Sequence, residues 1–369
     1  MIDILTKFDI LLYINIMKYK NKSIKSILFI VFFFTLLSGC SKNNVEDEKS
    51  VASESRLLLG TSCKITIYDY PTEEVFAKAF DRIADIEQKM SIRISSSEVS
   101  TINQNAGIKP VVVSDDTFLV IKEALEIASL SDGAFDPTVG PLVSDWNIGS
   151  DDARVPPQEE IDLLLPLIGY DMVTLDEEKK SVYLEKEGMM LDLGGIAKGY
   201  AADEVAKILV ANNIEKAIIN LGGNVLTIGT RVDGTKWRIG VQNPEAERGG
   251  YVMIVNLEDQ ALVTSGPYER FLEVDGVVYH HILDTNTGYP VVTNLTSASI
   301  IGPNSFISDA LSTALYSLGL EKGLALINSM DDVEAIFIDD KDEIYVSQGF
   351  KDNSIPFSVS EESFKVVEL

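Results

Sequence analysis

The chain has 369 residues, with 57 acidic against 31 basic side chains and a formal net charge of −26. This balance offers no basic face to neutralise phosphates, which excludes nucleic acid as a partner. It also requires that any anionic ligand be held by a metal cation or by the positive ends of helices.

The N-terminus carries an export signal. A cationic stretch, residues 18–25, precedes an almost wholly apolar run, residues 27–37. The apolar run is too short for a membrane-spanning helix, which needs about 20 residues, and is typical of a signal-peptide core. A signal peptide begins just before its charged region, so Met17 is the better start and residues 1–16 need not be translated.

The segment Leu37-Ser38-Gly39-Cys40 resembles a bacterial lipobox. We expect residues 1–39 to be removed and the thiol of Cys40 to be lipidated, with palmitate among its acyl chains. The product would be a lipoprotein anchored in the cell membrane at its extracytoplasmic face, the periplasmic side of the inner membrane in a Gram-negative organism. The alternative is an ordinary signal peptide with an incidental cysteine. Cys63 is the only other thiol, so no intrachain disulfide is expected.

One acidic globular region is predicted to follow. Residues 40–55 are expected to hold the lipidated cysteine and a flexible tether, residues 56–350 the folded domain, and residues 351–369 a C-terminal tail. The spacing of apolar residues predicts, in chain order, a strand at 64–68, helices at 72–90 and 117–131, a loop at 144–157, strands at 182–184 and 190–193, a helix at 197–212, a strand at 217–221, short strands between 237 and 279, a helix at 308–318 and a strand pair at 333–346. Strands and helices mix without a regular β-α period, so the predicted fold class is α+β, with mixed sheets and packed helices.

The only two histidines are adjacent, His280 and His281, and Asp284 and a turn follow them. Two bases that titrate near neutrality suggest a proton-transfer site. Alternation along a strand would point one ring inward and the other outward. Two structural histidines at a polar strand end are the alternative.

A glycine turn lies between a predicted strand and a predicted helix, in residues 191–200. This arrangement aims backbone N–H groups at a ligand phosphate. It matches neither the dinucleotide fingerprint nor the P-loop, and glycine turns before helices are common.

Asp309 and Thr313 are spaced to lie on one face of a predicted helix. A carboxylate and a hydroxyl are hard oxygen ligands that suit Mg²⁺. The alternative is an acidic residue that stabilises the first turn of a helix.

Taken together and in this order, several short motifs resemble the ApbE family, the FAD:protein FMN transferases. The matching segments span about residue 57 to about residue 330 and are Leu59-Gly60-Thr61, Met90-Ser91, residues 97–100, residues 133–142, residues 191–200, residues 219–224, residues 237–240, residues 264–266, Tyr268-Glu269-Arg270, residues 281–288 and residues 309–313. The resemblance implies an ApbE-like single domain of two intertwined subdomains.

The activity that the resemblance implies is transfer of FMN from FAD onto a Thr or Ser hydroxyl of a target protein, with release of AMP. Mg²⁺ would be the cofactor and FAD the substrate. The implied acceptors are extracytoplasmic subunits of Rnf-type and Na⁺-pumping Nqr-type complexes, or related flavoproteins. Mg²⁺ fits the acidic composition, because a cation must offset the repulsion between the acidic protein and the negatively charged diphosphate of FAD.

The resemblance also assigns site residues. His281 would be the catalytic base, and the metal would be held by the side chains of Asp309 and Thr313 with a backbone carbonyl of Gly195. The implied FAD contacts are Leu59, Ala134, Phe135, Asp136, Asp192, Lys198, Leu283 and Asp284.

Four positions depart from the family pattern. Leu59 stands where Met is common, Pro267 where Asp is common, and Thr285 where Pro often stands, and Arg93 lies where an aromatic residue is frequent. Two other functions remain open at this stage. One is a Mg²⁺-dependent FAD pyrophosphatase, in which water replaces the hydroxyl. The other is a non-catalytic lipoprotein that binds FAD.

Overall fold

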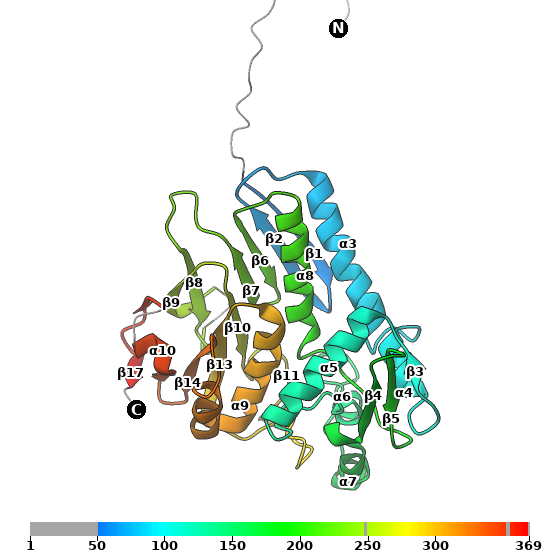
Figure 1. The fold of residues 1–369 in the computed structure, drawn as a ribbon. Helices are drawn as coiled ribbons and strands as arrows, with labels where there is room; N and C mark the ends of the chain where they lie inside the picture. Colours follow the sequence, from blue (N-terminus) through cyan, green and yellow to red (C-terminus); the bar gives the residue numbers. More distant parts are fainter. Residues whose placement is uncertain (1–50, 247–248, 352–354, 368–369) are drawn as a thin grey trace, which may run out of the picture. The chain divides into compact units, whose positions relative to one another are not determined.

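The computed structural model describes residues 51–246, 249–351 and 355–367 (Figure 1). The expected signal peptide, the expected lipidation site at Cys40 and most of the expected tether lie outside the described residues. Within these ranges, no helix is both long enough and apolar enough to cross a membrane.

A nine-stranded sheet forms the centre of the domain, and its strand order follows the order of the chain. In sheet order the strands are β1 (Ala52–Leu58), β2 (Thr61–Ile67), β6 (Ala217–Leu221), β7 (Asn224–Ile228), β10 (Ala261–Ser265), β13 (Leu295–Gly302), β14 (Glu334–Asp339), β15 (Glu343–Val346) and β17 (Lys365–Val367). Neighbouring strands are antiparallel except β15 and β17, which are parallel. The sheet is therefore mixed, and the α+β prediction is confirmed.

Three smaller sheets accompany it. They are formed by β3 (Val111–Val112), β5 (Ser181–Leu184) and β4 (Val173–Asp176); by β16 (Phe357–Val359), β9 (Tyr251–Leu257) and β8 (Trp237–Gln242); and by the hairpin of β11 (Phe271–Val274) and β12 (Val277–His280). The described helices are α3 (Glu73–Met90), α4 (Glu98–Gln104), α5 (Asp115–Leu130), α6 (Gly140–Trp146), α7 (Gln158–Leu164), α8 (Ala197–Ala211), α9 (Ser305–Ile327) and α10 (Gln348–Lys351), with 3-10 turns at Leu165–Leu167 and Tyr170–Met172.

The large sheet is covered on both faces. Helices α3, α8 and α9 pack along one face (Figure 1), and β8 and β9 pack against the other. Successive residues of β6 show this division, because Ile219 belongs to the core under the helices and Ile218 contacts the core under β8 and β9.

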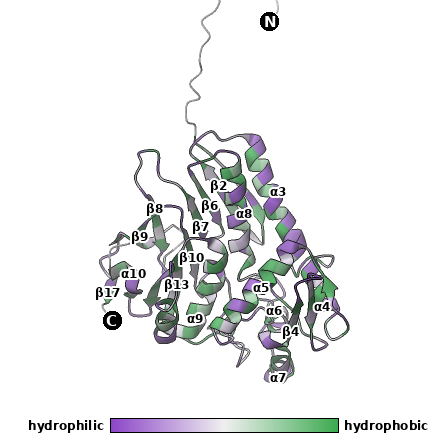
Figure 2. Cartoon of the chain, viewed as in Figure 1, coloured by the Kyte–Doolittle hydropathy of each residue, from purple (hydrophilic) through white to green (hydrophobic). Residues whose placement is uncertain are grey.

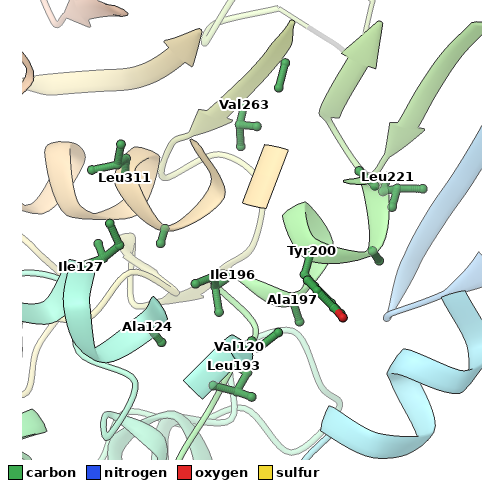
Figure 3. Close-up of a cluster of buried hydrophobic side chains, with 14 of the residues drawn as sticks. Val120, Ala124, Ile127, Leu193, Ile196, Ala197, Tyr200, Leu221, Val263 and Leu311 are labelled. Atoms are coloured by element: carbon green, nitrogen blue, oxygen red, sulfur yellow. The ribbon is translucent and has the colours of Figure 1, made fainter. Parts of the chain in front are cut away.

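Figure 3 shows where α5, α8 and α9 meet against the sheet. Val120 and Ala124 of α5, Ile196 just before α8 and Leu311 of α9 lie in one buried cluster with Val263 of β10. This packing places the N-terminal end of α8 beside the first turns of α9.

Helix α3 confirms the predicted helix at 72–90. Thr72 caps it by accepting a hydrogen bond from the N–H of Val75. Its buried side chains recur at helical spacing, and the helix is hydrophobic on one part of its surface and hydrophilic on another (Figure 2).

Both predicted ends of the domain are corrected by the structure. Residues 52–55 belong to β1, not to a tether, and pair with residues 64–67 of β2. The predicted tail at 351–369 contains β16 and β17, and Phe364 is buried there. These three strands alternate poorly in hydrophobicity because each lies at the edge of its sheet and exposes much of its surface.

Two internal elements also differ from the predictions. Residues 190–193 do not form a strand; Met190 makes only an isolated bridge to Val139. The helix predicted at 308–318 begins earlier, at Ser305, and continues beyond a kink at Gly319, whose φ of 74° is outside the helical region. The predicted end at Leu318 falls directly before this kink, and the helical residues beyond it were not predicted. Cys63 is a free, buried thiol.

Candidate functional site

The candidate site is built around the start of α8. The Asn103 amide pairs with both backbone groups of Leu191, at 2.8 and 3.0 Å, as a neighbouring strand would. This holds the residues before α8 in place without a β-ladder, which explains why the predicted strand is absent. One residue on, Oδ1 of Asp192 accepts a hydrogen bond from the N–H of Gly194 at 2.7 Å and forms the glycine turn.

Asp309 of α9 reaches back to this turn. The residue is 3% exposed, and its carboxylate accepts a hydrogen bond from the N–H of Gly199 at 2.9 Å. The Lys198 ammonium lies 3.2 Å from Oδ1 of Asp309 and also donates to the carbonyl of Gly194 at 3.0 Å. The two helices come this close because position 199 is glycine: a Cβ there would lie 2.2 Å from the carbonyl oxygen of Ser305.

Thr313 lies one helical turn beyond Asp309. Its hydroxyl is 3.3 Å from that of Ser265, which ends β10 and also contacts Ser312 at 2.8 Å. A Cβ built on Gly195 would lie 3.7 Å from the Thr313 hydroxyl and 3.0 Å from the ring of Phe135. The three predicted metal-binding residues are thus brought together by α8, α9 and β10.

The chemistry of these donors fits Mg²⁺. A carboxylate, a hydroxyl and backbone carbonyls are hard oxygen ligands, which this ion prefers. The Lys198 ammonium already bridges the Asp309 carboxylate and a glycine carbonyl, so this set of oxygens attracts a cation. No group of three or more His, Cys, Asp or Glu side chains in the described ranges could hold a metal, so Mg²⁺ here would depend on hydroxyl, carbonyl and substrate oxygens.

The two histidines have different environments. His280 is buried and 8% exposed; its Nδ1 accepts from the N–H of Ile282, so its Nε2 carries the proton and donates to the carbonyl of Val291 at 3.0 Å. Its ring also packs edge-on against Tyr316. Both nitrogens of His280 are therefore used within the fold, which gives this ring the structural role that the alternative interpretation assigned to both histidines.

His281 retains a free nitrogen. Its Nδ1 lies 3.1 Å from the carbonyl of Arg270 and must carry the proton, since a carbonyl only accepts. Nε2 is then an unprotonated base without a partner among the described side chains. Burial, with the positive charges of Arg270 and Lys198, lowers the pKa of His281 to about 4. The ring therefore stays neutral at physiological pH and can accept a proton.

Arg270 joins segments that are distant in sequence. One of its guanidinium nitrogens, Nη2, lies 3.4 Å from the carbonyl of Gly60, next to Leu59 in the β1–β2 turn. Its Cδ would lie 3.3 Å from a Cβ built on Gly149. Leu59 adopts a φ of 52° in this turn, a backbone conformation that is unusual for leucine.

Two predicted FAD contacts use their carboxylates within the fold. Asp136 accepts hydrogen bonds from the N–H and hydroxyl of Thr138 and from the N–H of Tyr170. Burial raises the pKa of Asp136 despite these hydrogen bonds. Asp284 accepts from the N–H groups of Asn286 and Thr287 and closes a turn. Their contacts with FAD stay predictions, but both carboxylates shape loops.

A cavity of about 390 Å³ lies between these two loops and the kinked part of α9. Ala134 and Asp284 line it with Thr285 and Lys322. The side chain of Leu283, in contrast, is buried in a separate cluster with Trp146. Its contact with FAD also stays a prediction.

The carboxyl of Asp192 lies in the glycine turn, where three cations act on it. Burial raises the pKa of its carboxyl, while the N–H of Gly194 and the charges of Lys198, Arg270 and Arg93 favour the ionised form. The sequence interpretation assigned no role to Asn103, Ser265 or Arg270. Ser265 and Arg270 lie in matching motifs, which was the available signal; Asn103 offered none.

Comparisons with known proteins identify the relatives of this chain. The ApbE family model matches residues 59–337. A FAD:protein FMN transferase of Klebsiella pneumoniae is 37% identical over 321 residues, covering 87% of this chain and 98% of the relative. One from Treponema pallidum is 36% identical over 317 residues, covering 81% and 88%.

Solved structures show the same fold. The ApbE protein of Thermotoga maritima superposes with a TM-score of 0.76 at 35% identity, covering 82% of this chain and 98% of the other. The flavin transferase ApbE of Vibrio cholerae gives 0.74 at 29%, covering 82% and 99%. The chain belongs to the ApbE family.

Proposed function

We propose that the protein is an enzyme that transfers FMN from FAD to a Ser or Thr hydroxyl of an acceptor protein and releases AMP. Family membership and the activity named for its relatives support this. One observation of the structure carries it: the start of α8 brings Lys198 and Gly195 together with Asp309 and Thr313 of α9, which makes a set of hard oxygens that attracts a cation. His281, whose Nε2 is free among the described residues, supplies a base on which the charge of Lys198 acts.

The reaction follows from this arrangement. The acceptor hydroxyl oxygen attacks the phosphorus of the FMN half of FAD. The bond between this phosphorus and the bridging oxygen of the diphosphate breaks, and AMP leaves with the bridging oxygen. The hydroxyl proton passes to Nε2 of His281 and then to solvent. The Arg270 carbonyl keeps the ring in the tautomer that can accept this proton.

The described residues also offer positively charged and N–H groups that could bind the diphosphate of FAD. Lys198 places a positive charge beside Asp309, and the glycine turn presents backbone N–H groups at the start of α8. Mg²⁺, when bound by Asp309, Thr313 and a backbone oxygen of Gly195, would supply the charge stabilisation that phosphoryl transfer requires.

We further propose that Cys40 carries lipid and holds the enzyme at the extracytoplasmic face of the cell membrane. The lipobox-like segment and the short apolar run before it support this proposal. Membrane-bound acceptors of the Rnf or Nqr type would then lie on the same surface. Mass spectrometry of the N-terminal peptide from membrane fractions tests it, and an unmodified Cys40 would reject the lipid anchor.

Transfer is tested by incubating the protein with FAD, Mg²⁺ and a candidate acceptor subunit. We expect intact-mass spectrometry to show the acceptor heavier by one FMN group, and chromatography to show an equal amount of AMP. A Ser/Thr→Ala acceptor variant serves as control. Release of FMN and AMP at the same rate without any acceptor would favour the pyrophosphatase instead.

A further inference from the structure

Arg270 differs from Lys198 in having no acidic partner among the described residues. Among the described residues, no carboxylate oxygen lies within 4.0 Å of its guanidinium, whereas Lys198 pairs with Asp309. Its one hydrogen bond, to the Gly60 carbonyl, is long at 3.4 Å. In a chain with 57 acidic residues, this guanidinium is free to bind a further anion.

The position of this guanidinium is restricted by its surroundings. The turn at Leu59 and Gly60 lies against one end of it, and Gly149 lies against its stem. Its charge acts on the carboxyl of Asp192, which shapes the glycine turn, and on the ring of His281. The backbone carbonyl of the same arginine lies 3.1 Å from Nδ1 of His281, so this residue is directly adjacent to the base.

We propose that Arg270 is a catalytic residue that binds the phosphoryl group of the FMN half of FAD during its transfer. The proposal rests on the proposed function. Guanidinium is planar and can donate two parallel hydrogen bonds to phosphate oxygens, which holds the group in one orientation. It also neutralises charge on the transferred group, which is the main requirement of phosphoryl transfer.

Arg270 would then act through two separate parts. Its backbone carbonyl accepts from Nδ1 of His281 and orients the base. Its side chain binds the group that the activated hydroxyl attacks. Because the carbonyl remains in every variant, substitution of the side chain removes the phosphoryl contact and leaves the orientation of His281 intact.

The first experiment compares R270Q and R270K with R238Q as matched control. Arg238 of β8 is exposed and, within the described ranges, also lacks an acidic partner, so its loss changes the net charge equally. We expect R270Q to lower the single-turnover rate of FMN transfer at saturating FAD by ~10²–10³-fold, R270K to restore part of it, and R238Q to retain it. A rate for R270Q within about threefold of wild type overturns the proposal.

A second experiment does not depend on transfer. Fluorescence titration measures the preference of each variant for FMN over riboflavin, which differ only in the phosphate. We expect R270Q to lose most of this preference and R238Q to keep it. An unchanged preference in R270Q rejects the proposal. If the wild type transfers no FMN, the proposed function fails, but the binding preference still tests Arg270. Melting curves establish that each variant is folded, and R270K replaces R270Q if the latter is not.

Discussion

Helix α8 contributes to two groups of charged side chains, and they differ in how completely they are paired. The first, which we call the interhelical ion network, consists of Arg82 and Lys89 of α3, Asp116 of α5, and Tyr200 and Glu204 of α8. Arg82 donates two hydrogen bonds of 2.7 Å to the carboxylate of Asp116 and one of 2.7 Å to Glu204. The Tyr200 hydroxyl adds one of 2.6 Å to Asp116.

The second group is the candidate site at the N-terminal end of α8, and its charged side chains are only partly paired. Lys198 has one carboxylate, Arg270 has none, and Nε2 of His281 has no partner among the described residues. A network in which each charge is matched can only stabilise the helices it joins. Charges that lack partners instead favour the binding of a charged ligand, and this difference separates the structural cluster from the functional one.

The largest expected effect is on the base. His281→Ala should slow FMN transfer by ~10²–10⁴-fold, the usual contribution of a positioned general base. FAD affinity should change little, because the imidazole need not touch the diphosphate. Single-turnover rates at saturating FAD measure the first quantity and fluorescence quenching the second.

His280→Ala is the matched control for this experiment. Both nitrogens of His280 bond within the fold, so its loss should reduce stability but affect the transfer rate much less. A slower rate in His280→Ala than in His281→Ala would reverse the assignment of the two rings.

The second prediction concerns the metal site. Asp309→Asn should remove most Mg²⁺-dependent activity, a loss of several kcal/mol or ~10³-fold in rate. Asparagine preserves an acceptor for the N–H of Gly199, which matters because Asp309 is buried, not at the surface as a helix-start carboxylate would be. Titrating Mg²⁺ against activity in both proteins is the measurement. An unchanged Mg²⁺ requirement would refute Asp309 as a ligand.

The third prediction concerns a substitution that disrupts the interhelical ion network. Asp116→Asn should lower the free energy of unfolding by about 2–3 kcal/mol, because it weakens several charged hydrogen bonds, while transfer by the folded enzyme continues. Asp176→Asn, which loses only an exposed pair with Lys179, should have no measurable effect. Urea unfolding measures both, and equal stability of Asp116→Asn and wild type would show that the network is dispensable.

The pH dependence of this difference has a defined sign. Hydrogen bonds from Arg82 lower the pKa of Asp116 below its ordinary value. The stabilisation is therefore present above the unfolded pKa of about 4 and declines as pH falls below it. The stability difference between wild type and Asp116→Asn should shrink in that range.

The smallest expected effect is in the pH profile of transfer. Since the pKa of His281 is lowered to about 4, kcat/KM should be nearly flat from neutral pH to about 5 and fall as pH approaches 4. Circular dichroism at each pH separates this loss from unfolding. An inflection near 6.5, the ordinary histidine value, would mean that the burial of this ring has little effect.

Periodic patterns predicted most of the buried elements. The helical spacing of Val75, Ala79 and Ile83 and the apolar run of β6 each specified an element by itself. The edge strands were missed, because β1, β16 and β17 are ordered by pairing with distant strands and not by their own composition.

Candidate site residues stood out in the sequence where a residue type is rare or its spacing is regular, as for His281 and the pair Asp309 and Thr313, and the family resemblance supplied the roles predicted for them. Arg270 could not be found in this way, since its position depends on Gly60, which is 210 residues away in the chain. Asp136 shows the opposite problem. A motif cannot distinguish a carboxylate that binds a ligand from one that shapes its own loop.

The order of strands in the large sheet has a consequence for how the chain folds. From β1 to β17, each strand is added beside one that precedes it in the sequence, and no later strand is inserted between two earlier ones. A chain emerging N-terminus first can therefore extend the sheet in one direction, each new strand pairing with the edge left by the last. While the sheet grows, its leading edge stays open to the next strand or to another molecule, and in the finished sheet this edge is β17, a strand of only three residues that offers little backbone for a further strand to pair with.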